Sequence, residues 1–98
     1  NQFLIPAMQI TQFEWSEERV WHIARHRVDP EEVEEAWFSR APLIERGHGE
    51  LYYVSGTTNA GRRLFIVIRY VGQGKAKVIT ARDMDQGERR RYHHRKGS

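Results

Sequence analysis

The chain has 98 residues, the size of one domain, and its 16 lysines and arginines outnumber its 13 acidic residues for a net charge of +3. It has no cysteine, which excludes disulfides and thiolate chemistry and fits a reducing compartment. The longest apolar run, residues 64–68, is far shorter than the ~20 residues of a membrane span. We therefore expect a cytoplasmic protein that does not enter a membrane.

A single domain is expected over residues 9–96. Residues 1–8 are interpreted as a flexible N-terminal arm or added residues, and residues 97–98 as a tail. Both ends are left out of the fold prediction.

The first predicted elements are a short strand within residues 9–15 and a helix that begins at Ser16. Serine is a favoured N-cap, and the two glutamates that follow it suit the positive end of the helix dipole. An apolar stripe of Val20, Ile23 and Ala24 carries this helix to about Arg27.

A second helix is predicted to start at Asp29. Pro30 fits the first helical position, and Glu32 completes a capping-box spacing. Val33, Ala36 and Trp37 form its apolar face, and Pro42 prevents its continuation.

Three β segments follow, at residues 51–56, 63–71 and 75–82, and glycine-containing turns separate them. They predict an antiparallel meander, extended by residues 43–46 or by the N-terminal strand. Asp85 and Glu88 repeat the capping spacing and open a last, basic helix. The predicted class is α+β, in the order β-α-α-β-β-β-α, with two helices on one face of a mostly antiparallel sheet.

Strand register determines which side chains share a face. A turn at residues 59–60 predicts that Gly56 pairs with Arg63, and a turn at 73–74 predicts that Phe65 pairs with Arg82. The core face then carries Leu51, Tyr53, Leu64, Ile66, Ile68, Ile79 and Ala81. The opposite face carries Glu50, Tyr52, Arg63, Arg69, Thr80 and Arg82 among Val54, Phe65, Val67 and Val78.

The charged residues of that second face suggest a phosphodiester site. Arginine binds phosphate bidentately and stays charged, while a carboxylate or histidine can accept the proton of an RNA 2′-hydroxyl. The competing interpretation is an ordinary cross-strand ion pair between Glu50 and Arg69, which contributes ~0.2–1 kcal/mol.

Positive charge is concentrated in the last helix, where Glu88 is the one acid against four arginines and Lys96. Such a surface attracts an anionic partner, here RNA. A merely solvated helix face is the alternative.

The histidine pair His22 and His26 has the i, i+4 spacing that can hold zinc. No glutamate follows the first histidine and no third ligand is evident, so we expect no metal and no cofactor. His26, at the helix end, is a candidate phosphate contact or proton carrier, or else a surface histidine that complements the helix dipole.

Several motifs resemble the BrnT toxins. The N-terminal half resembles them at Phe13-Glu14-Trp15 and at residues 22–28 and 30–36. Glu50, Gly56, Gly61-Arg62, Thr80-Ala81-Arg82 and Glu88-Arg89-Arg90 with Tyr92 continue the likeness to residue 92. The chain departs from the family pattern at Ser16, Arg27 and Leu51.

This resemblance implies a fold like that of the RelE ribonucleases, metal-independent RNA cleavage, and neutralisation by a ribbon-helix-helix antitoxin. Combined with the sheet-face argument, it gives His26, Glu50, Arg69 and Arg82 as catalytic candidates. The RNA-binding candidates are Arg25, Arg62, Arg63, Arg89, Arg90 and Tyr92. The expected assembly is either a homodimer or a toxin–antitoxin heterotetramer. The alternative function is a non-catalytic module that binds nucleic acid or the antitoxin on the same scaffold.

Overall fold

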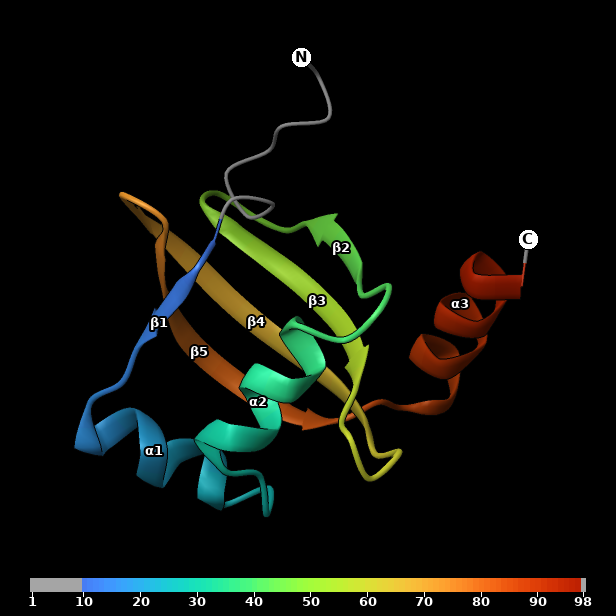
Figure 1. The fold of residues 1–98 in the computed structure, drawn as a ribbon, viewed down its shortest axis with the longest axis horizontal. Coiled ribbons are helices and arrows are strands. Elements are labelled where there is room, and N and C mark those ends of the chain that lie inside the picture. Colours follow the sequence, from blue (N-terminus) through green and yellow to red (C-terminus); the bar gives the residue numbers. More distant parts are fainter. Residues whose placement is uncertain (1–9, 98) are drawn as a thin grey trace.

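The computed structural model describes residues 10–97, with side chains to residue 95, and contains one five-stranded sheet in the order β1-β5-β4-β3-β2 (Figure 1). The elements are β1 Gln12–Glu14, α1 Glu17–Ala24, α2 Pro30–Trp37, β2 Leu43–Arg46, β3 Leu51–Thr57, β4 Arg63–Gly72, β5 Lys75–Asp83 and α3 Gln86–Gly97. β1 pairs with β5 in parallel, and every other pairing is antiparallel. The predicted α+β class is confirmed, and both proposed extensions of the meander, β1 and β2, are present.

The predicted arm at residues 1–8 lies outside the described residues. At the other end α3 continues through Gly97, so the predicted tail is helical there. None of the helices in the described part of the chain is long and apolar enough to cross a membrane.

The helix starts follow the predicted caps. The Ser16 hydroxyl accepts a hydrogen bond from the Arg19 backbone N–H at 3.1 Å. At α2, Asp29 and Glu32 each accept a bond from the other's backbone N–H, at 2.9 and 3.2 Å, which is the complete capping box. α1 ends at Ala24, earlier than the predicted end at about Arg27. The chain turns through Arg27 at φ 60°, a left-handed conformation that a right-handed α-helix does not contain.

The main core lies between the sheet and the pair α1 and α2 (Figure 1). Buried side chains from the helices include Ile23, Val33, Ala36 and Trp37, and they meet Tyr52, Val54, Leu64, Ile66, Ile68, Val78 and Ala81 of the sheet. At Gly56 the backbone of α2 comes so close that a β-carbon would collide with the Ala36 carbonyl. Glycine therefore permits α2 to pack directly on β3.

A second, smaller core lies on the opposite face, where α3 packs. Tyr92 of α3 is buried with Leu43, Phe65 and Met84, and Tyr53 packs against them. The Tyr92 hydroxyl shares a 2.7 Å hydrogen bond with the Thr57 hydroxyl of β3. Helices α1 and α2 thus cover one face of the sheet, and α3 packs on the other.

The predicted register of the first hairpin is wrong by one residue. Thr57 pairs with Arg63, and Gly56 pairs with Leu64 rather than with Arg63. The Thr58 N–H donates to the Arg62 carbonyl at 2.8 Å, so the loop between them is the three residues 59–61, ending in Gly61 at φ 90°, and not the two-residue turn assumed from the sequence. In consequence Tyr52 and Val54 lie in the main core, and Tyr53 lies on the α3 face, the reverse of the prediction.

The predicted register of the second hairpin is correct at the end far from its turn. Phe65 pairs with Arg82, as predicted, and both lie on the face opposite α1 and α2. A bulge beside Ile68 then shifts the register, so that Val78 enters the core in place of Ile79, and Arg69 pairs with Lys77.

Candidate nucleic-acid interface

Arg82, near the end of β5, is held in a fixed position by Glu88 of α3. Its two terminal nitrogens donate to the two carboxylate oxygens of Glu88, each at 2.8 Å. Its guanidinium carbon also lies 4.7 Å from the centre of the Phe65 ring. The hydrogen bond to Glu88 raises the pKa of Arg82 above its ordinary value, against the opposing effect of burial. Arg82 is therefore a permanent cation in a defined orientation.

Glu88 can reach Arg82 because of the way α3 begins. Asp85 and Glu88 form a reciprocal cap, in which Asp85 accepts from the Glu88 N–H at 2.8 Å and Glu88 accepts from the Asp85 N–H at 2.9 Å. The Glu88 side chain is 12% exposed, and its carboxylate thus both caps the helix and binds the arginine. This joins the end of β5 rigidly to the first turn of α3.

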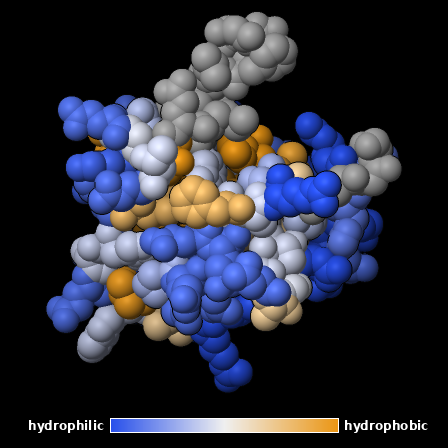
Figure 2. Space-filling view, viewed as in Figure 1, coloured by the Kyte–Doolittle hydropathy of each residue, from blue (hydrophilic) through white to orange (hydrophobic). Residues whose placement is uncertain are grey.

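A shallow basic hollow opens beside this first turn. We call it the basic hollow; it is lined by Arg63, Gln86, Gly87, Arg89, Arg90, Arg91, His93 and His94. In Figure 2 the surface over α3, on the right of the view, is strongly hydrophilic. Three predicted RNA-binding residues, Arg63, Arg89 and Arg90, lie together here, and Arg82 is joined to the same helix turn through Glu88. Clustered arginines of this kind suit a polyanion.

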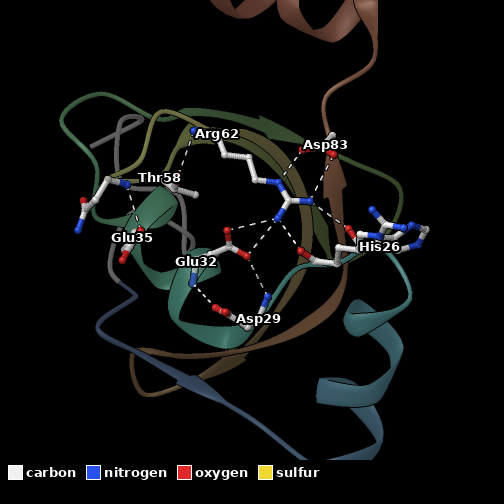
Figure 3. A network of polar contacts seen from close by, with 9 residues as sticks. His26, Asp29, Glu32, Glu35, Thr58, Arg62 and Asp83 are labelled. Carbon is white, nitrogen blue, oxygen red and sulfur yellow. Dashed lines mark hydrogen bonds and ion pairs between the residues drawn. The ribbon is translucent and has the colours of Figure 1, made fainter.

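Arg62, also predicted to bind RNA, is instead the centre of an internal network (Figure 3). Its guanidinium donates to the Asp83 carboxylate at 2.7 Å, to Glu32 at 3.1 Å, and to the backbone carbonyls of His26 and Arg27. The bond from Arg62 lowers the pKa of the Asp83 carboxyl below its usual range, although partial burial opposes the shift. Arg62 therefore ties the α1–α2 turn to the end of β5.

Tyr92 is the other RNA-binding candidate that the structure places internally. It is 2% exposed, and its ring fills the second core while its hydroxyl bonds Thr57. In this fold its ring offers no surface on which a base could stack.

The four catalytic candidates do not converge on one point. His26 is exposed in the turn after α1, on the side of the sheet opposite to the Arg82 side chain, and Arg25 lies exposed beside it. Glu50 is not in a strand but in the exposed turn before β3. Arg69 lies four residues along β4 from the partner of Arg82, or roughly 13 Å at the usual rise per residue. The predicted cross-strand pair of Glu50 with Arg69 is wrong, because Arg69 pairs with Leu51.

His22 of α1 and His26 of the turn after it lie side by side. The centroids of their rings are 6.4 Å apart, and the rings meet nearly edge-on. Among residues 10–95, no group of three or more histidine, aspartate or glutamate side chains is placed to hold a metal ion.

Sequence reasoning missed the acidic partners of the arginines. Glu88 was recognised only as a cap, although the same Asp-x-x-Glu spacing fixes its carboxylate near the preceding strand end. The pairing of Glu45 with Arg91, at 3.2 Å, could not be predicted from the sequence, because β2 and α3 are distant in the chain. His93 and His94 also line the basic hollow. The sequence indicated only that they belong to the last helix.

Comparison with known proteins shows what this fold is similar to. No protein-family model and no curated protein sequence matches this chain. Among solved structures, the fold is similar to that of the Brucella abortus ribonuclease toxin BrnT, with a TM-score of 0.64 and 19% sequence identity, over 78% of this chain and 99% of that one. The BrnT-like fold expected from the motifs is thereby confirmed.

Proposed function

We propose that this chain is an RNA-cleaving toxin of a type II toxin–antitoxin pair. One observation supports this most: a chain with the fold of a ribonuclease toxin carries a braced arginine, Arg82, where a strand end meets the arginine-lined basic hollow. A fixed cation is suited to the charge that grows on a phosphate during cleavage.

The proposed reaction needs no metal. The 2′-oxygen of the RNA attacks the adjacent phosphorus, its proton passes to a base, and the 5′-oxygen leaves as it takes a proton from an acid or water. We assign the stabilisation of the phosphate charge to Arg82, and water beside it accepts the proton. His26 lies on the other side of the sheet, in a turn that Arg62 ties to Asp83, so we assign it a contact with RNA. Glu50 and Arg69 lie outside this arrangement, so we assign them contacts with RNA further from the scissile bond.

The partner and setting follow from the same proposal. An antitoxin with a ribbon-helix-helix domain would neutralise the toxin in the cytoplasm by placing acidic side chains on the basic hollow. Slower amide hydrogen exchange over residues 82–92 in the complex supports this arrangement, whereas unchanged exchange there counts against it.

A second candidate function is a non-catalytic module that binds RNA or the antitoxin. The separation of His26, Glu50 and Arg69 from Arg82 favours it, because a binding surface does not require catalytic groups to converge. RNA bound through the basic hollow without any cleavage is its signature.

The deciding experiment is incubation of the purified chain with RNA in excess EDTA. Cleavage that persists in EDTA supports the toxin and its metal independence together. RNA that is retained by the protein but never cut, with or without Mg²⁺, leaves the binding module as the function.

A further inference from the structure

The carboxylate of Glu88 occupies the position in which Arg82 would hold a phosphate. A guanidinium grips a carboxylate and a phosphate with the same two parallel N–H donors. Both Arg82–Glu88 bonds are 2.8 Å long, and the Arg82 side chain is more exposed, at 36%, than the Glu88 side chain, at 12%. The anion site at Arg82 is thus filled by the chain itself.

We propose that Glu88 is an intramolecular lock on Arg82, and that a phosphodiester enters the site only by displacing the Glu88 carboxylate. This proposal rests on the proposed function for the identity of the natural anion, RNA. The lock itself depends only on the geometry of Arg82 and Glu88.

The lock can open without unwinding α3, because capping and locking use different bonds. Glu88 Oε1 accepts the Asp85 N–H, which caps the helix, and also one Arg82 nitrogen, while Oε2 is bonded to Arg82 alone among the hydrogen bonds observed. The reciprocal bond, from the Glu88 N–H to Asp85, does not involve the Glu88 side chain at all. Displacement of the Glu88 carboxylate from Arg82 therefore leaves at least the bond from the Glu88 N–H to Asp85 to cap the helix.

Phe65 keeps the guanidinium in place when the carboxylate leaves. The Arg82 guanidinium carbon lies 4.7 Å from the centre of the Phe65 ring, within the range of a cation–π contact. The bond from Arg82 to the Asp83 carbonyl, at 3.1 Å, is also independent of Glu88. Arg82 thus remains oriented, so that exchange of one anion for another needs no rebuilding of the site.

Glu88→Gln separates the two roles of the carboxylate. Glutamine is accepted at this capping position, since its amide oxygen can still receive the Asp85 N–H. Its amide NH₂, however, would face a donor of Arg82, which breaks the two-pronged pair. Glu88→Asp is a second test variant: it keeps the negative charge but is one methylene too short to hold both prongs.

The matched control is Glu45→Gln. Glu45 is the other carboxylate paired with an arginine beside α3, Arg91, at 3.2 Å, and its removal changes the net charge equally without touching Arg82. An effect of charge alone appears in both glutamine variants, whereas an effect of the lock appears only at Glu88.

The first measurement is a titration with inorganic phosphate, followed through the side-chain Nε–H signal of Arg82 by NMR. We expect Glu88→Gln to bind phosphate at Arg82 about tenfold more tightly than wild type, Glu88→Asp to show part of that gain, and Glu45→Gln to resemble wild type. Equal phosphate affinity at Arg82 in Glu88→Gln and Glu45→Gln would overturn the lock.

The second measurement repeats the comparison with a short single-stranded RNA, with and without Arg82→Ala. The lock predicts a gain in RNA affinity for Glu88→Gln that disappears when Arg82 is absent. A gain for phosphate without any binding of RNA upholds the lock and rejects the proposed function. An RNA gain that is equal in Glu88→Gln and Glu45→Gln rejects the lock and leaves the proposed function intact.

Discussion

Arg62 donates from its Nε to the Asp83 carboxylate at 2.7 Å, and so joins the hairpin after β3 to the end of β5. The same guanidinium bonds the carbonyls of His26 and Arg27, where the chain turns between α1 and α2. One side chain thus connects three segments that lie near the proposed site.

Arg62→Met should destabilise the fold in a pH-dependent way. Because Arg62 lowers the pKa of Asp83, the stabilisation is fully present above the unfolded value of ~3.9 and is lost as the pH falls through the lower, folded value. We expect a loss of about 1 kcal/mol near neutral pH, kept small because Asp83 is well exposed. Urea unfolding of both proteins at about pH 7 and about pH 2 measures this. An equal loss at the two pH values would show that the ion pair contributes nothing.

Tyr92→Phe should lower the free energy of unfolding by about 1 kcal/mol, since it removes the bond to Thr57. Thr57→Val should cost a similar amount, and the double variant should cost little more than either one. Tyr92→Phe should leave RNA affinity unchanged. Weaker RNA binding at unchanged stability would restore Tyr92 to the RNA-binding role predicted from sequence.

Gly56→Ala should destabilise the protein by about 1–3 kcal/mol, because the new methyl group meets the Ala36 carbonyl on the backbone of α2. Gly87→Ala is the control. A β-carbon there meets only Asp85, at 3.6 Å, so the substitution in α3 should be neutral or stabilising. Thermal unfolding of the two variants is sufficient; a neutral Gly56→Ala contradicts the close packing of α2 on β3.

The sequence predicted best what depends on local chemistry. Ser16, Asp29 and Asp85 each begin a helix because capping is decided within four residues. Arg82 was placed on the correct face because its pairing with Phe65 precedes the bulge. The predicted register of the first hairpin was wrong because a three-residue loop, ending in Gly61 at positive φ, has a sequence much like that of a two-residue turn.

Contacts between segments that are distant in the chain could not be predicted from the sequence. The pairs of Arg62 with Glu32, and of Arg91 with Glu45, join elements 30 and 46 residues apart. Charge composition indicates that arginines and carboxylates are present, but not which of them neutralise one another. Arg62 was therefore predicted on the RNA surface, although its guanidinium is bound internally.

Arg89→Ala combined with Arg90→Ala should weaken RNA binding and reduce its dependence on salt. Both residues line the basic hollow, and for a single strand the slope of log K against log salt falls by about 0.7 for each phosphate that the protein no longer neutralises. Affinity measured over a series of salt concentrations gives this slope. An unchanged slope places the RNA elsewhere on the molecule.

The most direct test of the central claim is the rate of RNA cleavage by Arg82→Ala, measured in EDTA. Lys75→Ala is its control, because it removes one positive charge from the opposite end of β5. Circular dichroism first verifies that both variants keep their secondary structure. If Arg82 stabilises the transition state, its loss should slow cleavage by about 10²–10³, while Lys75→Ala should cleave nearly as wild type does. Cleavage at the wild-type rate by Arg82→Ala would contradict the assignment of this surface as the active site.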